Sequence, residues 1–384
     1  MNTLTRLFAA ALIVSLPAFT AVPSGAQDPA KPIAKKARDV DVVICLDISG
    51  SMNGLIDSAK NKLWDIVNEL AKIKPTPNMR VALYTYGCDA YDPKVGWVKK
   101  DLDLTTDLDM LYQKLFALKT NGGTEYATRV CRDAVRDLKW SQDKDALKIV
   151  FVCGNEPAAQ DPLVKLKEAA DFAISKGVII NTIYCGGSDD GDARDWREFA
   201  SLSGGRFAAI DQNRSQIAIV APQDKQLAEL GNKLNETYVC YGVKGREKSF
   251  NQKAQTFNAN QQSPSVGATR TLSQAGGLYR NEDWDLVDRL KIDPKFDITK
   301  IPDAELSDEL KKLRPAERVT YVKNMADKRA TLQKEIVELQ AKRQTFIAEE
   351  MKRNPNPAGR AFDAAIQDAL RIQAGAKGIV IPKE

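Results

Sequence analysis

A short apolar run that ends in small polar residues is the feature that most constrains the fold of this chain. Residues 42–46 read V-V-I-C-L, which is typical of a strand buried on both faces of a parallel sheet. Residues 47–51 read D-I-S-G-S, and a helical pattern begins soon after them. One carboxylate and two hydroxyls therefore lie on a loop at the carboxyl end of a strand, where open α/β sheets bind ligands.

The spacing of Asp47, Ser49 and Ser51 indicates a site for a hard cation. The three residues alternate along the loop, so their oxygen atoms can turn toward one point if the loop is extended. Oxygen ligands that carry little charge suit Mg²⁺ or a similar ion, and they leave positions for water or for a partner's carboxylate. Taken alone the pattern is weak, because Asp and Ser after a strand often form a turn and cap the next helix.

Strand and helix patterns alternate from residue 42 to about residue 234. After the first strand, further strands are expected over 80–86, 96–104, 147–152, 178–184 and 206–210. Helices are expected over 55–73, 107–118, 125–140, 162–176, 193–202 and 227–234, with Thr106 as the cap of the second. The alternation predicts an α/β fold with a doubly wound, mostly parallel sheet and helices on both faces.

The D-x-S-x-S run after a buried strand resembles the metal-ion-dependent adhesion site of von Willebrand factor A-like domains, in an exported bacterial form. That family uses the Asp, the two Ser, a Thr from a second loop and often an Asp from a third loop. Thr124, in the segment T-N-G-G-T-E, matches the family Thr. In the third loop, C-G-N-E-P, Gly154 stands where the family often has its Asp, and Asn155 and Glu156 are the oxygen donors nearby.

The resemblance implies a von Willebrand A-like domain over residues 39–240, with one antiparallel strand at the edge of the sheet. It also implies a module that binds another protein and depends on Mg²⁺ or Mn²⁺, with an acidic side chain of the partner completing the coordination. The expected metal ligands are Asp47, Ser49, Ser51, Thr124, Asn155 and Glu156, and no catalytic residue is assigned.

The chain has 384 residues and contains no histidine. This removes Ser-His and Cys-His nucleophile pairs, imidazole zinc sites and the usual general base, so an enzyme is not expected. A metal-assisted hydrolase with Glu125 or Glu156 as the base is a disfavoured alternative, because Mg²⁺ activates water poorly compared with Zn²⁺. The formal net charge of +5 is too small to indicate nucleic acid as a partner.

The N-terminus is predicted to be a secretory signal over residues 1–26. Arg6 supplies its positive region, residues 7–14 its apolar core, and the small residues before and at Ala26 its cleavage site. An uncleaved anchor is the alternative, but the apolar run is broken by Pro17 and is short for a span of about 20 residues. Residues 27–38 read as a flexible leader. The mature protein is therefore expected in a periplasm or outside the cell, without a transmembrane anchor.

The six cysteines fit an oxidising compartment only loosely, because they are widely spaced and form no C-x-x-C. We expect small buried side chains on central strands. A disulfide between neighbouring strand ends is the first alternative, and a thiolate metal cluster is a remote one. The residues are Cys45, Cys88, Cys131, Cys153, Cys185 and Cys240.

The C-terminal part is expected to be helical. Residues 241–313 read as a polar linker with short helices, and 314–384 as a long helix over 315–353 followed by a helix over 358–374 that stops at Gly375. Arg329 and Arg343 interrupt an apolar seam on the long helix, so it reads as an imperfect coiled-coil strand or as an arm packed on one partner. The seam residues are Val322, Met325, Leu332, Ile336, Leu339 and Phe346.

Two arrangements of this C-terminal part remain open from the sequence. The two helices can pair as an intramolecular hairpin, or the long helix can carry a homo-oligomer or a docked partner. The second arrangement goes with an alternative function, in which the protein is a metal-free scaffold that interacts through its C-terminal helical arm. Chelator sensitivity of partner binding would separate the two functions.

Overall fold

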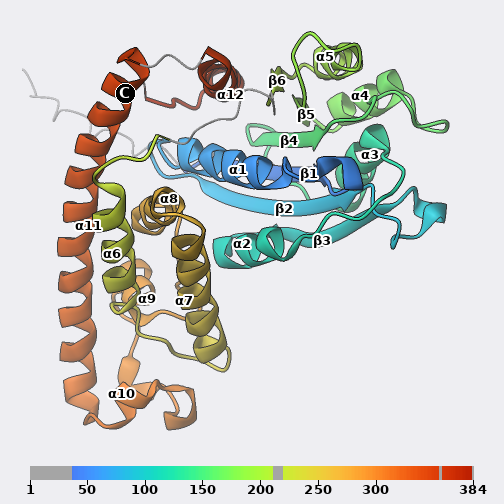
Figure 1. Cartoon of the computed structure of the whole chain (residues 1–384). Helices are drawn as coiled ribbons and strands as arrows, with labels where there is room; N and C mark the ends of the chain where they lie inside the picture. Colours follow the sequence, from blue (N-terminus) through green and yellow to red (C-terminus); the bar gives the residue numbers. More distant parts are fainter. Residues whose placement is uncertain (1–36, 211–218, 354–356, 383–384) are drawn as a thin grey trace, which may run out of the picture. The chain divides into compact units, whose positions relative to one another are not determined.

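The sheet has six strands in the order β3-β2-β1-β4-β5-β6 in the computed structural model, which describes residues 37–210, 219–353 and 357–382 (Figure 1). All neighbouring strands are parallel except β2 and β3, so the antiparallel strand lies at an edge. The predicted mostly parallel sheet is confirmed. The strands are β1 (Asp39–Asp47), β2 (Asn78–Tyr86), β3 (Val98–Thr105), β4 (Leu147–Gly154), β5 (Ile179–Tyr184) and β6 (Phe207–Ala209).

Strand β1 lies between β2 and β4 and is buried along nearly its whole length. Its register aligns Asp47 with Tyr86 of β2 and Leu46 with Cys153 of β4. The chain leaves β1 toward β2 and later returns to add β4 on the other side, so the strand order reverses at β1. Loops that leave such a reversal diverge, and a ligand site opens at the carboxyl ends of the strands.

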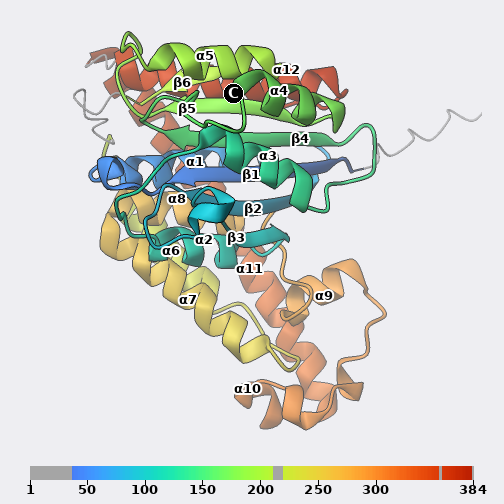
Figure 2. The same cartoon turned by 90° about the vertical axis from the view of Figure 1, so that its right-hand side faces the viewer.

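Helices cover both faces of this sheet (Figure 2). Because side chains alternate along a strand, Ile44 and Leu46 pack on one face while Val43 and Cys45 pack on the other. The first face is covered by α1 (Ile56–Leu70), α2 (Leu108–Ala117) and part of α12 (Pro357–Ala376). The second is covered by α3 (Ala127–Asp137), α4 (Leu166–Ser175) and α5 (Ala193–Leu202).

Three predicted helix ends are wrong for identifiable reasons. Helix α2 is capped by Asp107 instead of Thr106, because the Asp107 carboxylate accepts a hydrogen bond from the Met110 N–H at 3.0 Å. Helix α4 begins at Leu166, four residues later than predicted, because Asp161 holds the preceding residues in a turn. Helix α12 runs through Gly375 to Ala376, and the left-handed residue beyond it is Gly378, with φ +67°.

The residues after the sheet form seven helices within the described part of the chain. Residues 241–313, which were expected to be a polar linker with short helices, contain two consecutive helices, α7 (Gly245–Gln262) and α8 (Pro264–Ala275). They are separated at Ser263, which caps α8. The predicted long helix is confirmed with its bounds. The helices are α6 (Asp224–Asn235), α7, α8, α9 (Leu286–Ile292), α10 (Asp308–Lys311), α11 (Pro315–Arg353) and α12.

The seam of α11 packs against helices of the same chain. Leu332, Ile336 and Leu339 join Leu227, Leu230 and Leu234 of α6 and Ala268 of α8 in one buried cluster. The seam therefore has its partner within the chain. The predicted hairpin is wrong, because α11 lies along α6, α8 and α9, whereas α12 packs on β6 and α1.

The predicted signal sequence, its cleavage site at Ala26 and the leader as far as residue 36 lie outside the described residues. Within the described ranges, no helix combines the length and the apolar character that a membrane span requires.

Candidate metal-binding site

Three loops meet at the carboxyl end of β1. The first carries Asp47, Ser49 and Ser51, and the second and third precede α3 and follow β4. The first two loops are joined by a hydrogen bond of 2.9 Å from the Asn121 N–H to the Ile48 carbonyl. Loops that come from separate strands are thus fixed to one another by the backbone, which is what a preorganised ligand site needs.

The structure brings four of the predicted ligands into one hydrogen-bonded chain. Asp47 Oδ1 accepts from the Ser49 N–H at 2.8 Å, and the hydroxyls of Ser49 and Ser51 are hydrogen-bonded at 2.9 Å. The Ser51 hydroxyl donates to Asn155 Oδ1 at 3.0 Å. The first and third loops therefore present their oxygen atoms to one another, as the alternation of Asp47, Ser49 and Ser51 predicted.

Thr124 and Glu156 are less closely tied to this chain. Thr124 is half-buried in the second loop, between Gly123 and Glu125. Glu156 is fixed through its backbone, because its carbonyl accepts from Trp196 Nε1 at 2.8 Å. Its side chain is half-buried, and its negative charge acts on Asp47 and on Glu125.

One carboxylate oxygen at the centre of the site lacks a partner. Asp47 is 1% exposed, and its Oδ2 atom is buried without a hydrogen-bond partner among the described residues. An unpaired buried oxygen of an ionised carboxylate is costly, and proteins relieve this cost by protonation or by a bound cation. The residues present therefore fit a hard cation, since the donors around Asp47 are hydroxyl, amide and carboxylate oxygens.

The raised pKa values of the acidic residues in the site also fit a bound cation. Burial raises the pKa of Asp47 to about 7, the hydrogen bonds from Ser49 oppose the rise, and the negative charges of Glu125 and Glu156 add to it. Burial also raises the pKa of Glu125, and the charge of Glu156 contributes. A divalent cation reverses such shifts, because it stabilises the charged form of every carboxylate around it.

The lack of the family's third-loop Asp has a steric reason in this chain. A Cβ atom at Gly154 would lie 2.4 Å from the Tyr86 hydroxyl oxygen and 3.0 Å from Asp47 Oδ2. The Tyr86 hydroxyl is held there because it donates to the Cys153 carbonyl at 2.9 Å. A side chain at position 154 would therefore collide with a tyrosine that β2 contributes to the site.

Glu125 was named from the sequence only as the base of a disfavoured hydrolase and not among the metal ligands. It lies close to Asp47 because Gly87, at φ +78°, has no side chain; a Cβ there would be 2.8 Å from Asp47 Oδ1 and 3.0 Å from Glu125 Cγ. Gln160 Nε2 donates to the Glu125 carbonyl at 2.6 Å and to the Glu125 carboxylate at 3.5 Å. The position of Glu125 directly after Thr124 was the feature of the sequence that could have identified it as a ligand.

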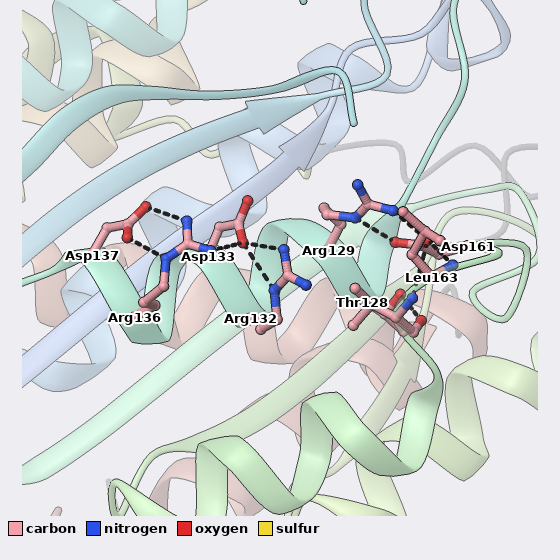
Figure 3. Close-up of polar contacts among 9 residues, drawn as sticks. Thr128, Arg129, Arg132, Asp133, Arg136, Asp137, Asp161 and Leu163 are labelled. Atoms are coloured by element: carbon pink, nitrogen blue, oxygen red, sulfur yellow. Dashed lines mark hydrogen bonds and ion pairs between the residues drawn. The ribbon is translucent and has the colours of Figure 1, made fainter. Parts of the chain in front are cut away.

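A buried ion pair fixes the second loop relative to the third (Figure 3). Arg129 of α3 donates to Asp161 at 2.8 and 2.6 Å, and Asp161 also accepts from the Leu163 N–H at 2.8 Å. Although burial opposes it, the hydrogen bonds from Arg129 hold the pKa of Asp161 below its usual range. Helix α3, which follows the second loop, is thereby tied to the segment that follows the third.

No group of three or more His, Cys, Asp or Glu side chains suited to a metal ion occurs in the described part of the chain. Any cation at the end of β1 would therefore depend on hydroxyl and amide oxygens as well as on carboxylates. This donor set excludes a thiolate or imidazole zinc centre among the described residues and leaves hard cations as the class that fits.

The cysteines are buried, as expected, and four of them lie in pairs on opposite faces of the sheet. Cys45 and Cys131 are hydrogen-bonded on one face, and Cys153 and Cys185 on the other. Burial, with the contact to Cys45, raises the pKa of the Cys131 thiol. The hydrogen bond with Cys185, with burial, raises the pKa of the Cys153 thiol. The raised pKa values keep the Cys131 and Cys153 thiols protonated at neutral pH, so these two are poor nucleophiles.

Alkylation of the native protein is expected to modify Cys240 first, because it is half-buried whereas the other five cysteines are buried. Mass spectrometry after brief treatment with iodoacetamide should show one modified thiol, and treatment in denaturant should modify all six. Equal rates for all six thiols in the native protein would contradict the burial. Two thiols that resist alkylation in denaturant until a reductant is added would indicate a disulfide.

The comparisons with known proteins identify the class of the domain. Residues 41–223 match the family model of the von Willebrand factor type A domain. The comparison with curated proteins finds no match. With β1 at the centre and one antiparallel edge strand, the segment has a von Willebrand A-like fold, and the fold expected from the D-x-S-x-S run is confirmed.

Solved structures resemble the chain over about half of its length. A von Willebrand factor type A protein from Catenulispora acidiphila is 19% identical, covers 46% of this chain and 40% of its own, and has a TM-score of 0.37. Proximal thread matrix protein 1 from the mussel byssus, with a zinc-occupied MIDAS motif, is 16% identical, covers 47% and 43%, and has a TM-score of 0.37. The SpRpn10 VWA domain is 16% identical, covers 47% and 98%, and has a TM-score of 0.35.

Proposed function

We propose that this chain is an exported protein-binding module whose binding depends on a divalent cation at the end of β1. The observation that carries the proposal is the buried, unpartnered Oδ2 of Asp47 beside the linked hydroxyls of Ser49 and Ser51. The match to von Willebrand factor type A domains supports it, because domains of this family are interaction modules that often bind a divalent metal. No catalytic role is proposed for any residue.

The ligands proposed for Mg²⁺ or Mn²⁺ are those named from the sequence: Asp47, Ser49, Ser51, Thr124, Asn155 and Glu156. The bound ion would supply positive charge at the surface of the domain, to which an acidic side chain of a protein partner binds. The protein's own residues then have two tasks. Ser49 and Ser51 orient the first loop, and Asn155 ties the third loop to it.

The proposal includes the rest of the chain. Residues 1–26 are the signal sequence, cleaved after Ala26, and 27–38 are the leader. The mature protein acts in a periplasm or outside the cell, with no nucleic acid as partner. Residues 39–240 form the binding domain, 241–313 the linking segment with short helices, and 314–384 the long helix and the C-terminal helix. The packing of the α11 seam on α6 and α8 disfavours the alternative of a scaffold or homo-oligomer that uses this seam.

Titration calorimetry of the mature chain with Mg²⁺ and with Mn²⁺ tests the cation site. Saturable binding is expected for the wild type and is expected to be lost in Asp47→Ala, because that variant removes the carboxylate at the centre of the site. Glu168→Ala is the matched control, since it removes one carboxylate from an exposed position on α4 and should bind as the wild type does. Unchanged binding by a folded Asp47→Ala protein would show that the ion lies elsewhere.

A further inference from the structure

We infer that Glu125 is the second carboxylate of this cation site and takes the role that the third loop of this chain cannot fill. The inference rests on the proposed function, because it assigns a further ligand to the same site. It adds a carboxylate of the second loop to the one that the first loop supplies, beside Glu156 of the third loop.

The third loop is a poor source of that carboxylate. Position 154 has no room for a side chain next to the Tyr86 hydroxyl. The backbone at Glu156 is turned toward α5, because its carbonyl accepts from Trp196 Nε1. Among the described residues, the side-chain hydrogen bond between the third loop and the first is made by Asn155, which is a neutral ligand.

The second loop brings Glu125 directly against Asp47. A point 2.8 Å from Asp47 Oδ1 and 3.0 Å from Glu125 Cγ lies where Gly87 would carry its Cβ. Asp47 Oδ1 and Glu125 Cγ are therefore no farther apart than the sum of these two distances. Gly87 has no side chain that would keep them apart. Ser49 Cβ lies 3.3 Å from the same point, so the side chains of Asp47, Glu125 and Ser49 gather around Gly87.

Two acidic groups in this arrangement need a positive charge. The Asp47 carboxylate is buried, its Oδ2 has no partner among the described residues, and the neighbouring charges that act most strongly on it are Glu125 and Glu156. Like charges at such a distance repel strongly in a partly desolvated site. A divalent cation removes this repulsion and gives Asp47 Oδ2 a partner. A bound cation therefore accounts both for the unpartnered oxygen and for the second carboxylate beside it.

The side-chain length of Glu125 fits this role. It comes from the loop that precedes α3, beyond the half-buried Thr124, and its Cγ lies beside Gly87, where Asp47 Oδ1 and Ser49 Cβ also lie. An Asp at position 125 is one methylene shorter and would not reach as far. The ligand set then contains carboxylate, hydroxyl and amide oxygens only, which is the set that Mg²⁺ and Mn²⁺ prefer.

The assignment also affects how strongly the bound ion attracts an acidic partner. With Asp47 and Glu125 both ionised, the two carboxylates balance the charge of a divalent ion, so the protein alone holds the ion more tightly. The same balance makes the ion less attractive to a third carboxylate. We therefore expect Glu125 to favour ion binding and to weaken the binding of an acidic partner. Glu125→Gln should accordingly weaken ion binding and strengthen the attraction of a bound ion for an acidic partner.

Calorimetric titration with MnCl₂ at neutral pH tests the inference on the mature chain. The variants compared are Glu125→Gln and Glu156→Gln, which make the same chemical change on adjacent loops, with Glu125→Asp as a test of reach. Glu125→Gln is expected to weaken Mn²⁺ binding by at least about tenfold, as losses of a metal-supporting group do. Glu125→Asp should weaken it as well. Glu156→Gln should weaken it less than Glu125→Gln does, and Glu168→Gln, at an exposed position on α4, should bind Mn²⁺ as the wild type does.

The outcomes separate this inference from the proposed function. If the wild type binds Mn²⁺, Asp47→Ala does not, and Glu125→Gln binds as the wild type does, the cation site stands and the role of Glu125 is overturned. A loss in Glu156→Gln alone would return the second charge to the third loop. If neither the wild type nor any variant binds Mn²⁺, the proposed function and the inference fail together. Circular dichroism of each variant establishes that it is folded before its binding is compared.

Discussion

Asp47→Asn is expected to stabilise the cation-free protein at pH 8 and to leave its stability nearly unchanged at pH 4. Burial raises the pKa of Asp47 to about 7 from 3.8, so the folded state holds this proton more tightly than the unfolded state does. The stabilising effect of that proton is complete below about pH 4 and is lost as the pH rises through 7. Above pH 7 the folded protein contains a buried charge that Asn does not have.

The size of the effect follows from the shift. Each pKa unit corresponds to about 1.4 kcal/mol, so the shift sets an upper value of roughly 4 kcal/mol at pH 8, and relaxation of the loop makes 2–4 kcal/mol the expected range, to order of magnitude. Asn has the shape of the protonated acid, and its Oδ1 can still accept from the Ser49 N–H. The variant therefore removes the charge and keeps the local hydrogen bond of the turn.

Urea unfolding of both proteins in the presence of a chelator, at pH 4, 6 and 8, measures this difference. Comparing the two proteins at each pH cancels the titration of groups that do not interact with position 47, which leaves Asp47 and its coupling to Glu125 and Glu156. Addition of Mg²⁺ or Mn²⁺ at pH 8 should stabilise the wild type and not the variant, because a ligand that binds only the folded state adds to its stability. A variant that is equally or less stable at pH 8 with chelator would show that Asp47 is not a strained carboxylate.

The parts of the site that the sequence predicts are those fixed by neighbours along the chain. The apolar run before Asp47 predicts a buried strand, and the spacing of Ser49 and Ser51 predicts that their oxygen atoms gather at its end. The parts of the site that the sequence did not explain depend on residues far away along the chain. Tyr86 fills the space beside Gly154, and no local pattern near residue 154 records a tyrosine on another strand.

The same reasoning explains Glu125. Its side chain reaches Asp47 because Gly87, on the segment after β2, leaves the space open. The sequence shows a Glu after Thr124, which is compatible with an exposed residue at the start of a helix or with a ligand. Only the approach of a glycine 38 positions earlier decides between them, and that approach is a property of the assembled sheet.

In the long helix α11, too, some features were predictable from the sequence and others were not. Its length follows from an unbroken helical pattern that begins at a proline, and the structure confirms it. Arg329 and Arg343 appeared as interruptions of the seam, but each pairs with an acidic residue elsewhere in the chain. Arg329 donates to Asp285 at 2.8 Å, and Arg343 to Asp224 at 2.5 Å. Periodicity predicts which face of a helix is apolar, but it does not predict which charges lie opposite that face.

Arg270→Met is expected to lower the free energy of unfolding by about 3–5 kcal/mol, the usual result of breaking a buried ion pair. Arg270 of α8 is fully buried and is paired with Asp109 of α2, which also accepts a hydrogen bond from Tyr279. Its guanidinium lies 5.3 Å from the ring centre of Tyr112 and 6.0 Å from that of Trp64. Removing the cation leaves the Asp109 carboxylate buried without its counter-ion.

A double-mutant cycle with Asp109→Asn distinguishes the ion pair from packing. If the pair acts as a unit, the double variant should be less destabilised than the sum of the single variants by about 2 kcal/mol or more. Arg194→Met is the matched control, because Arg194 is 86% exposed and its ion pair with Asp195 should contribute little. Additive losses would assign the effect to packing of the Arg270 side chain. Because Arg270 joins α8 to a helix of the sheet domain, a single unfolding transition that shifts as a whole in Arg270→Met would show that the helices after the sheet unfold together with it.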